Sequence, residues 1–127
     1  MSRTVISTPH APAAIGPYSQ AIAYGNLVFT SGQIPLDPAT QQMITGDIRA
    51  QTERVMQNLE AVLTAAGCDF SHVLKASIFV ADLADFAAVN EVYGKRFPQA
   101  PPTRSTVQVA ALPRGARVEI DLVAAKP

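Results

Sequence analysis

The 127-residue chain has little of several residue types, and each shortage excludes a class of protein. Its one cysteine, Cys68, excludes an internal disulfide, which fits a reducing cytosol and predicts a cytoplasmic location. Ten basic and ten acidic residues give no net charge, so neither nucleic acid nor an anionic membrane surface is an expected partner. The longest apolar stretch, residues 76–81, is far too short to cross a bilayer, and the N-terminus lacks the apolar core of a signal peptide.

The side chains of metal and nucleophile chemistry are scarce too. His10 and His72 are isolated, with no cysteine, histidine or acidic partner at ligand spacing, so no metal site is predicted. Cys68 follows Gly67 at an expected helix end, where a structural thiol is the usual case. The seven glycines are scattered and form no phosphate loop, and no glycine-flanked serine marks a nucleophile elbow.

Charged residues make up only 16% of the chain, against roughly 25% in an average soluble domain, whereas 48% of residues are hydrophobic. Residues 1–127 are long enough for one domain that buries roughly two-thirds of its unfolded surface. The shortage of charge therefore predicts that another subunit covers part of that surface.

The long secondary-structure elements are expected in the middle of the chain, because no proline lies between residues 39 and 97. Apolar residues recur at helical spacing over residues 47–66, and Gly67 is expected to end that helix with a left-handed cap. Residues 73–80 are typical of a buried strand. A second helix begins at Asp82 or Asp85, and its expected apolar stripe consists of Phe86, Val89, Tyr93 and Phe97.

Gly25-Asn26 separates two β-prone segments, residues 18–24 and 27–31, which predicts a β-hairpin with a type II′ turn. Residues 103–109 and 117–124 are expected to form the last two strands, and residues 4–7 a weak first strand. The order β-β-β-α-β-α-β-β predicts an α+β fold, in which two helices cover one face of a mixed six-stranded sheet and the other face stays open.

Arg104 stands in an otherwise uncharged, β-prone segment. Its guanidinium cannot lose its proton, so it either finds an anion or carries a desolvation cost. Its planar fork of donors suits a carboxylate or a phosphate. The competing interpretation is an ordinary ion pair with Glu119 or Asp121 on the next strand, and the local sequence leaves both open.

Strand alternation places Arg104, Thr106 and Gln108 on one face of their strand, and Arg117, Glu119 and Asp121 on one face of the next. The two polar faces could then offer a guanidinium and a carboxylate to one site. Glu119 could orient and deprotonate a water there, and a facing arginine would keep its carboxylate ionised.

The same residues resemble the hallmarks of a known family. Four motifs, in order and at matching spacing, are similar to those of the Rid proteins, the reactive intermediate deaminases, also called the YjgF or L-PSP endoribonuclease family. They are Gly16-Pro17-Tyr18-Ser19-Gln20-Ala21, Phe29-Thr30-Ser31-Gly32-Gln33-Ile34-Pro35, Pro102-Thr103-Arg104-Ser105 and Val118-Glu119-Ile120. The resemblance runs from Ile6 to Ala124 and includes residues 90–93.

This resemblance implies a chorismate-mutase-like fold of the Bacillus type, a homotrimer with sites in the clefts between subunits, and hydrolysis without a cofactor. Members of the RidA subgroup hydrolyse 2-imino acids, such as 2-iminopropanoate and 2-iminobutanoate, that pyridoxal-phosphate-dependent dehydratases release. By position, Arg104 would hold the substrate carboxylate and Glu119 would position the attacking water. Tyr18 would line the cleft, the backbone near Gly32 and Thr106 would contact the ligand, and Asn90 would sit at its edge. From its local sequence alone, Tyr18 is a core aromatic or a pocket-lining phenol, and the core is favoured.

Thr106 departs from the family pattern, because many members carry a cysteine there. The change excludes a thiol role and leaves the subgroup open. Two other functions stay under consideration: a non-catalytic module that binds small carboxylates such as keto acids, and the endoribonuclease or translation inhibitor that the older family name implies. Glu119 together with Arg104 favours catalysis, whereas zero net charge and the lack of a histidine pair disfavour RNA cleavage.

Overall fold

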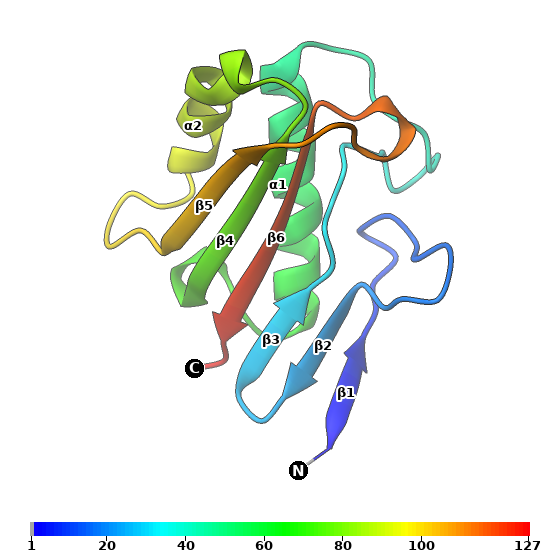
Figure 1. Ribbon diagram of the computed structural model, residues 1–127. Helices are drawn as coiled ribbons and strands as arrows, with labels where there is room; N and C mark the ends of the chain where they lie inside the picture. Colours follow the sequence, from blue (N-terminus) through cyan, green and yellow to red (C-terminus); the bar gives the residue numbers. More distant parts are fainter. Residues whose placement is uncertain (1) are drawn as a thin grey trace.

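The computed structural model describes residues 2–127, which form a six-stranded sheet with two α-helices behind it (Figure 1). Met1, the first residue of the predicted domain, lies outside the described residues. The strands run in the order β1-β2-β3-β6-β4-β5, and within residues 2–127 only β4 and β5 pair in parallel. The predicted α+β fold with a mixed sheet is therefore confirmed. The strands are β1 Arg3–Ile6, β2 Ala21–Tyr24, β3 Leu27–Thr30, β4 Val73–Val80, β5 Thr103–Gln108 and β6 Val118–Ala125.

Helix α1, Ile48–Ala65, begins and ends where local hydrogen bonding directs it. The Asp47 carboxylate accepts the backbone N–H of Ala50 and so caps the first turn. At the other end Gly67 takes a φ of +79°, and Cys68 N–H reaches the carbonyl of Leu63 at 2.8 Å. That hydrogen bond closes a Schellman motif, for which glycine is the favoured residue. The buried residues on the inner side of α1 include Val55, Met56, Leu59, Val62 and Leu63.

Helix α2, Phe86–Gly94, follows a single 3₁₀ turn, Leu83–Asp85, that the Asp82 side chain caps. Val89 and Tyr93 are buried as predicted, and Phe97 packs in the core beyond the helix end. Phe86 is different, because 39% of it is exposed. Phe86 is therefore the partly exposed end of the predicted apolar stripe. Phe86 is the first residue of α2, at the side of the sheet where β5 is the edge strand (Figure 1).

The predicted hairpin joins β2 and β3. Gly25 has a φ of +61° whereas Asn26 does not adopt a positive φ, which is the type II′ pattern. The strands are shorter than the sequence indicated. Residues 18–20 before β2 and Ser31 after β3 belong to the loops that surround a cleft.

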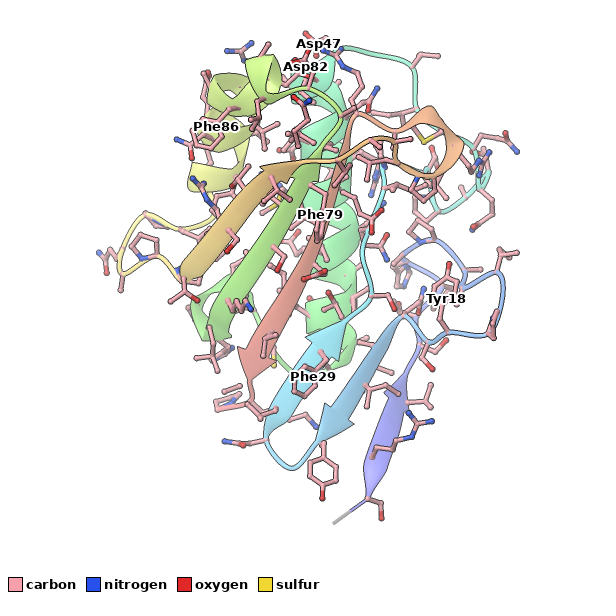
Figure 2. The ribbon with its side chains drawn as sticks, in the orientation of Figure 1. Tyr18, Phe29, Asp47, Phe79, Asp82 and Phe86 are labelled. Carbon is pink, nitrogen blue, oxygen red and sulfur yellow. The ribbon has the colours of Figure 1, made fainter. Side chains whose placement is uncertain are left out.

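The sheet has one covered and one open face. On the covered face, Ile78 pairs with Ile120 on β6, and both side chains are buried. On the open face lie Phe29, Phe79 and Val107, and Figure 2 shows Phe29 and Phe79 turned away from the helices. Phe29 and Val107 are exposed to solvent in the single chain. Within residues 2–127 the predicted open face is thus present, and it is apolar enough for a subunit contact.

Candidate functional site

Arg104 and Glu119 lie on opposite faces of the sheet, so the shared site predicted from strand alternation is wrong within one chain. The cause is strand order, because β4 lies between β5 and β6. Across β4, Arg104 pairs with Ala76 and Glu119 pairs with Phe79. Ala76 and Phe79 are an odd number of residues apart, and such positions point to opposite faces. The two groups therefore belong to two separate clefts.

Glu119 lies in a cleft of about 620 Å³ at the end of the sheet where the loops before β2, after β3 and before β6 meet. Two further residues of the predicted site, Tyr18 and Gly32, line the same cleft. The sequence prediction that Tyr18, Gly32 and Glu119 share a site is consistent with this grouping. The apolar side of the cleft consists of Pro12, Ala13, Ile15, Ile34, Leu36 and Pro113.

Gly32 leaves space in this cleft for the Glu119 side chain. Gln33 exchanges two backbone hydrogen bonds with Ile120, at 2.9 and 3.2 Å, and these draw the segment after β3 along β6. A Cβ atom built at Gly32 would collide with the carboxylate of Glu119. Any larger residue at this position would force the Glu119 side chain to move, although the φ of Gly32 is not in the left-handed region.

The Glu119 carboxyl group is poised to accept a proton. Burial raises its pKa above the usual value, and the neighbouring charge of Asp121 raises it further. The expectation that an arginine on the next strand keeps Glu119 ionised is wrong for the single chain, since Arg104 lies on the other face. A carboxylate with a raised pKa binds a proton more strongly, so it is a better general base than an ordinary carboxylate at neutral pH.

Tyr18 is 52% exposed, so its assignment to the core is wrong and the pocket-lining alternative is right. Its hydroxyl accepts the N–H of Ile15 at 3.3 Å, on the loop that Figure 2 shows beside the sheet. The buried Gln20 holds this loop in place. Its side chain donates to the carbonyls of Ala11 and Pro12, at 3.3 and 2.8 Å. The local sequence around Gln20 does not predict this role, because Ala11 and Pro12 lie in a separate segment of the loop.

Arg114 also lines the Glu119 cleft, and the sequence analysis missed it. It sits in a turn with a φ of +57°. Its guanidinium donates to the backbone carbonyl of Gln41 at 2.9 Å and to the side-chain oxygen of Gln42 at 3.4 Å. These bonds tie the loop before β6 to the loop after β3. The sequence indicated only a turn here, because the partner residues are more than seventy positions away.

Arg104 lies in a second cleft, of about 430 Å³, with Asn90, Tyr93 and Phe97 among its lining residues. One guanidinium nitrogen, Nη1, donates to the side-chain oxygen of Asn90 at 2.6 Å. The guanidinium carbon lies 5.4 Å from the ring centre of Phe86 and 5.3 Å from that of Tyr93. The predicted neighbours Arg104 and Asn90 are thus brought together.

No carboxylate of residues 2–127 forms an ion pair with Arg104. The structural alternative, an ion pair with Glu119 or Asp121 of the same chain, is therefore wrong. Every contact described above leaves the positive charge intact, because an amide and two aromatic rings are neutral. Arg104 has the properties of an anion receptor.

Thr106 shares a face with Arg104 but points toward the core, where it pairs with Ile78. Its hydroxyl is buried and finds no hydrogen-bond partner among residues 2–127. Neither cleft is lined by its side chain. A contact between substrate and this position stays a prediction.

His72 and Cys68 have structural roles. His72 accepts the N–H of Asp69 at 2.9 Å in a capping box. Cys68 is buried, and burial raises the pKa of its thiol. No cluster of three or more histidine, cysteine or acidic residues suited to a metal is found in residues 2–127. Neither helix in this range has the length and apolar character needed to span a bilayer.

The fold and motifs agree with comparisons to known proteins. The sequence pattern of the family described as Endoribonuclease L-PSP matches residues 8–126. The chain is 62% identical over 126 residues to protein DfrA of Myxococcus xanthus, covering 98% of this chain and 96% of that protein. It is 51% identical to Reactive Intermediate Deaminase A of Arabidopsis thaliana, covering 98% of this chain and 66% of the relative. It is 48% identical to the 2-iminobutanoate/2-iminopropanoate deaminase of Capra hircus, covering 96% and 89%.

Solved structures give the same result. A Rid-family protein from Yersinia pestis superposes with a TM-score of 0.95 at 43% identity, covering 98% of this chain and 99% of that one. E. coli TdcF with bound serine gives a TM-score of 0.91 at 41% identity, covering 98% and 99%. The chain belongs to the Rid family, also described as Endoribonuclease L-PSP, and the family predicted from the sequence is confirmed.

Proposed function

We propose that this chain hydrolyses small 2-imino acids to 2-keto acids and ammonia. The observation that carries the proposal is Arg104, an arginine held by neutral partners so that its charge stays available to a carboxylate. The names of relatives at 48 to 51% identity support the same chemistry. The imine would come from a pyridoxal-phosphate-dependent dehydratase. Residues 1–127 would form one Rid domain, and the single buried cysteine supports a cytosolic location.

The reaction needs a held substrate and a directed water. Arg104 would bind the substrate carboxylate through two parallel hydrogen bonds. Glu119 would take a proton from water while the water oxygen bonds to the imine carbon and the C=N electron pair moves to nitrogen, and Glu119 would then pass that proton to the nitrogen. Glu119 would next take the hydroxyl proton of the resulting carbinolamine and pass it to the amine nitrogen, so that the C=O bond forms and the C–N bond breaks to release ammonia. An imine is already electrophilic, so positioning and a base are sufficient.

For this reaction, Arg104 and Glu119 would come from different subunits, because within one chain their side chains lie on opposite faces of the sheet. A small imino acid is too short to contact both. In the proposed homotrimer, Arg104 of one subunit meets the cleft that holds Glu119, Tyr18 and Gly32 of the next. The open apolar face, where Phe29 and Val107 are exposed, supports such an assembly. Asn90 would lie at the edge of the composite site beside Arg104.

Sedimentation tests the oligomeric state, and it should give about three times the chain mass of 13.4 kDa. Mixing two impaired variants then tests whether the site is composite. Arg104→Ala and Glu119→Gln should each keep at most about a hundredth of wild-type activity alone. When the two are co-expressed, a cyclic trimer contains some sites with both residues intact, roughly a quarter of all sites at equal mixing. Imine hydrolysis should recover to about that fraction. An active monomer, or mixed trimers that stay inactive, would contradict the composite site.

Asn90→Asp tests whether Arg104 must keep its charge free. The new carboxylate would stand where the Asn90 oxygen accepts from Arg104 at 2.6 Å, and it would compete with the substrate for the guanidinium. We expect affinity for 2-oxobutanoate to fall by about tenfold or more, the scale of a hydrogen bond to a charged group. Asn90→Ala removes only one orienting contact, so its affinity for 2-oxobutanoate should fall less. Calorimetric titration of both variants decides, and an aspartate variant with wild-type affinity would refute the charge argument.

An assay coupled to a dehydratase, with ammonia and keto-acid release as readouts, tests the activity itself. A non-catalytic binding module would bind 2-oxobutanoate without accelerating hydrolysis. The family description raises a second activity, RNA cleavage, so a labelled RNA is incubated in parallel. RNA cleavage commonly uses a histidine as its general base. The side chain of His72 is already engaged in a capping box, so it is a poor candidate for that role. We expect imine hydrolysis and intact RNA.

A further inference from the structure

Phe86 is an unusual residue for its position. It is a large aromatic side chain, 39% exposed, at the start of α2 (Figure 2). Its ring contacts Arg104, whose guanidinium carbon lies 5.4 Å from the ring centre. A single exposed aromatic needs no explanation by itself. An exposed aromatic ring that contacts the arginine expected to bind substrate does need an explanation.

Helical spacing brings three neutral groups to Arg104. Phe86, Asn90 and Tyr93 are separated by four and then three residues, so they lie on one side of α2. That side faces β5, where Arg104 meets both rings and the Asn90 amide. The face of an aromatic ring is negative, and a flat guanidinium is attracted to it.

This arrangement orients the guanidinium without neutralising it. A free arginine side chain has many rotamers, and a ligand that must immobilise one loses about two- to tenfold in affinity. An acidic residue would also hold Arg104, but it would occupy the charge that the substrate needs. Aromatic rings avoid both costs, because they restrict the side chain and leave its N–H donors at the edge of the plane free.

We propose that Phe86, together with Tyr93, is a positioning residue that holds the Arg104 guanidinium ready for the substrate carboxylate. Its kinetic consequences rest on the proposed imine hydrolysis, whereas the contact itself does not. Phe86 acts on binding through Arg104 and has no part in proton transfer, which belongs to Glu119 on the other face.

Phe86→Leu removes the ring face and keeps an apolar side chain of similar size, and Phe86→Trp keeps a ring. For the leucine variant we expect the Kd for 2-oxobutanoate and the KM for the imine to rise about three- to tenfold, with little change in kcat or Tm. The tryptophan variant should restore both constants. Leu83→Ala is the matched control, since Leu83 is 49% exposed on the turn before α2 and makes no cation–π contact with Arg104. It should behave as wild type.

The Nε–H proton of Arg104, identified as the NMR signal missing from Arg104→Lys, gives a readout independent of activity. A ring face should shift this signal upfield in the wild type, and Phe86→Leu should reduce the shift. If the wild type neither hydrolyses imines nor binds 2-oxobutanoate, the proposed function fails and the NMR signal still decides the positioning role. The role is overturned if the leucine variant keeps the wild-type shift or the wild-type KM and Kd. Loss of Tm and kcat that tryptophan does not restore would likewise overturn it, in favour of a structural role.

Discussion

Replacing Arg104 with alanine is expected to abolish imine hydrolysis while the chain stays folded. Arg104 is exposed and, among residues 2–127, its side chain makes one hydrogen bond, to Asn90, so its loss should change stability by well under the amount needed to unfold the chain. Its loss from the site removes the charged partner of the substrate carboxylate, which costs at least about 10²-fold in kcat/KM. Turnover and Tm measured on the same preparation test both parts.

Arg104→Lys is the informative companion. It keeps the charge, but a single ammonium cannot form two parallel hydrogen bonds to a carboxylate, nor does it stack flat on the Phe86 ring. We expect it to fail badly as well. Full activity of the lysine variant would refute two-point recognition. If the alanine variant unfolds instead, Arg104 is a structural residue and the receptor interpretation falls.

Glu119→Gln is expected to reduce turnover by roughly 10²-fold or more, the usual loss for a positioned general base. Glutamine keeps the size and hydrogen-bonding capacity of the side chain but cannot take the proton from water. The fold should tolerate the change, since burial raises the pKa of Glu119 and therefore already disfavours its charged form. Affinity for 2-oxobutanoate should change much less, because Arg104 holds the carboxylate.

Asp121→Asn provides the control for Glu119→Gln. Asp121 lies two positions along the same strand on the same face, and burial raises its pKa as well, but it does not line the cleft. Its replacement should leave turnover within a few-fold of wild type. A glutamine variant of Glu119 that binds keto acid poorly but turns over normally would show that Glu119 serves binding, as a simple pair for Arg104 would.

Much of the fold follows from local sequence. Asp47 and Gly67 mark the two ends of α1, and residues 73–80 predict β4 with the observed bounds. Helix caps and strand alternation depend on residues a few positions apart, so they can be predicted from a short stretch of sequence. The motifs around Tyr18, Gly32, Arg104 and Glu119 were similarly enough to predict the family that the comparisons confirm.

The arrangement of the site could not be obtained this way. Consecutive strands suggested that Arg104 and Glu119 share a face, but β4 lies between β5 and β6 and places them on opposite faces. The close approach of Gly32 to Glu119, and the contact between Phe86 and Arg104, likewise involve residues far apart in the chain. By itself, the sequence determined the order of the elements, the ends of α1 and β4, and the family. Tertiary structure decided which groups can meet, because that depends on strand order and on the packing of the whole sheet.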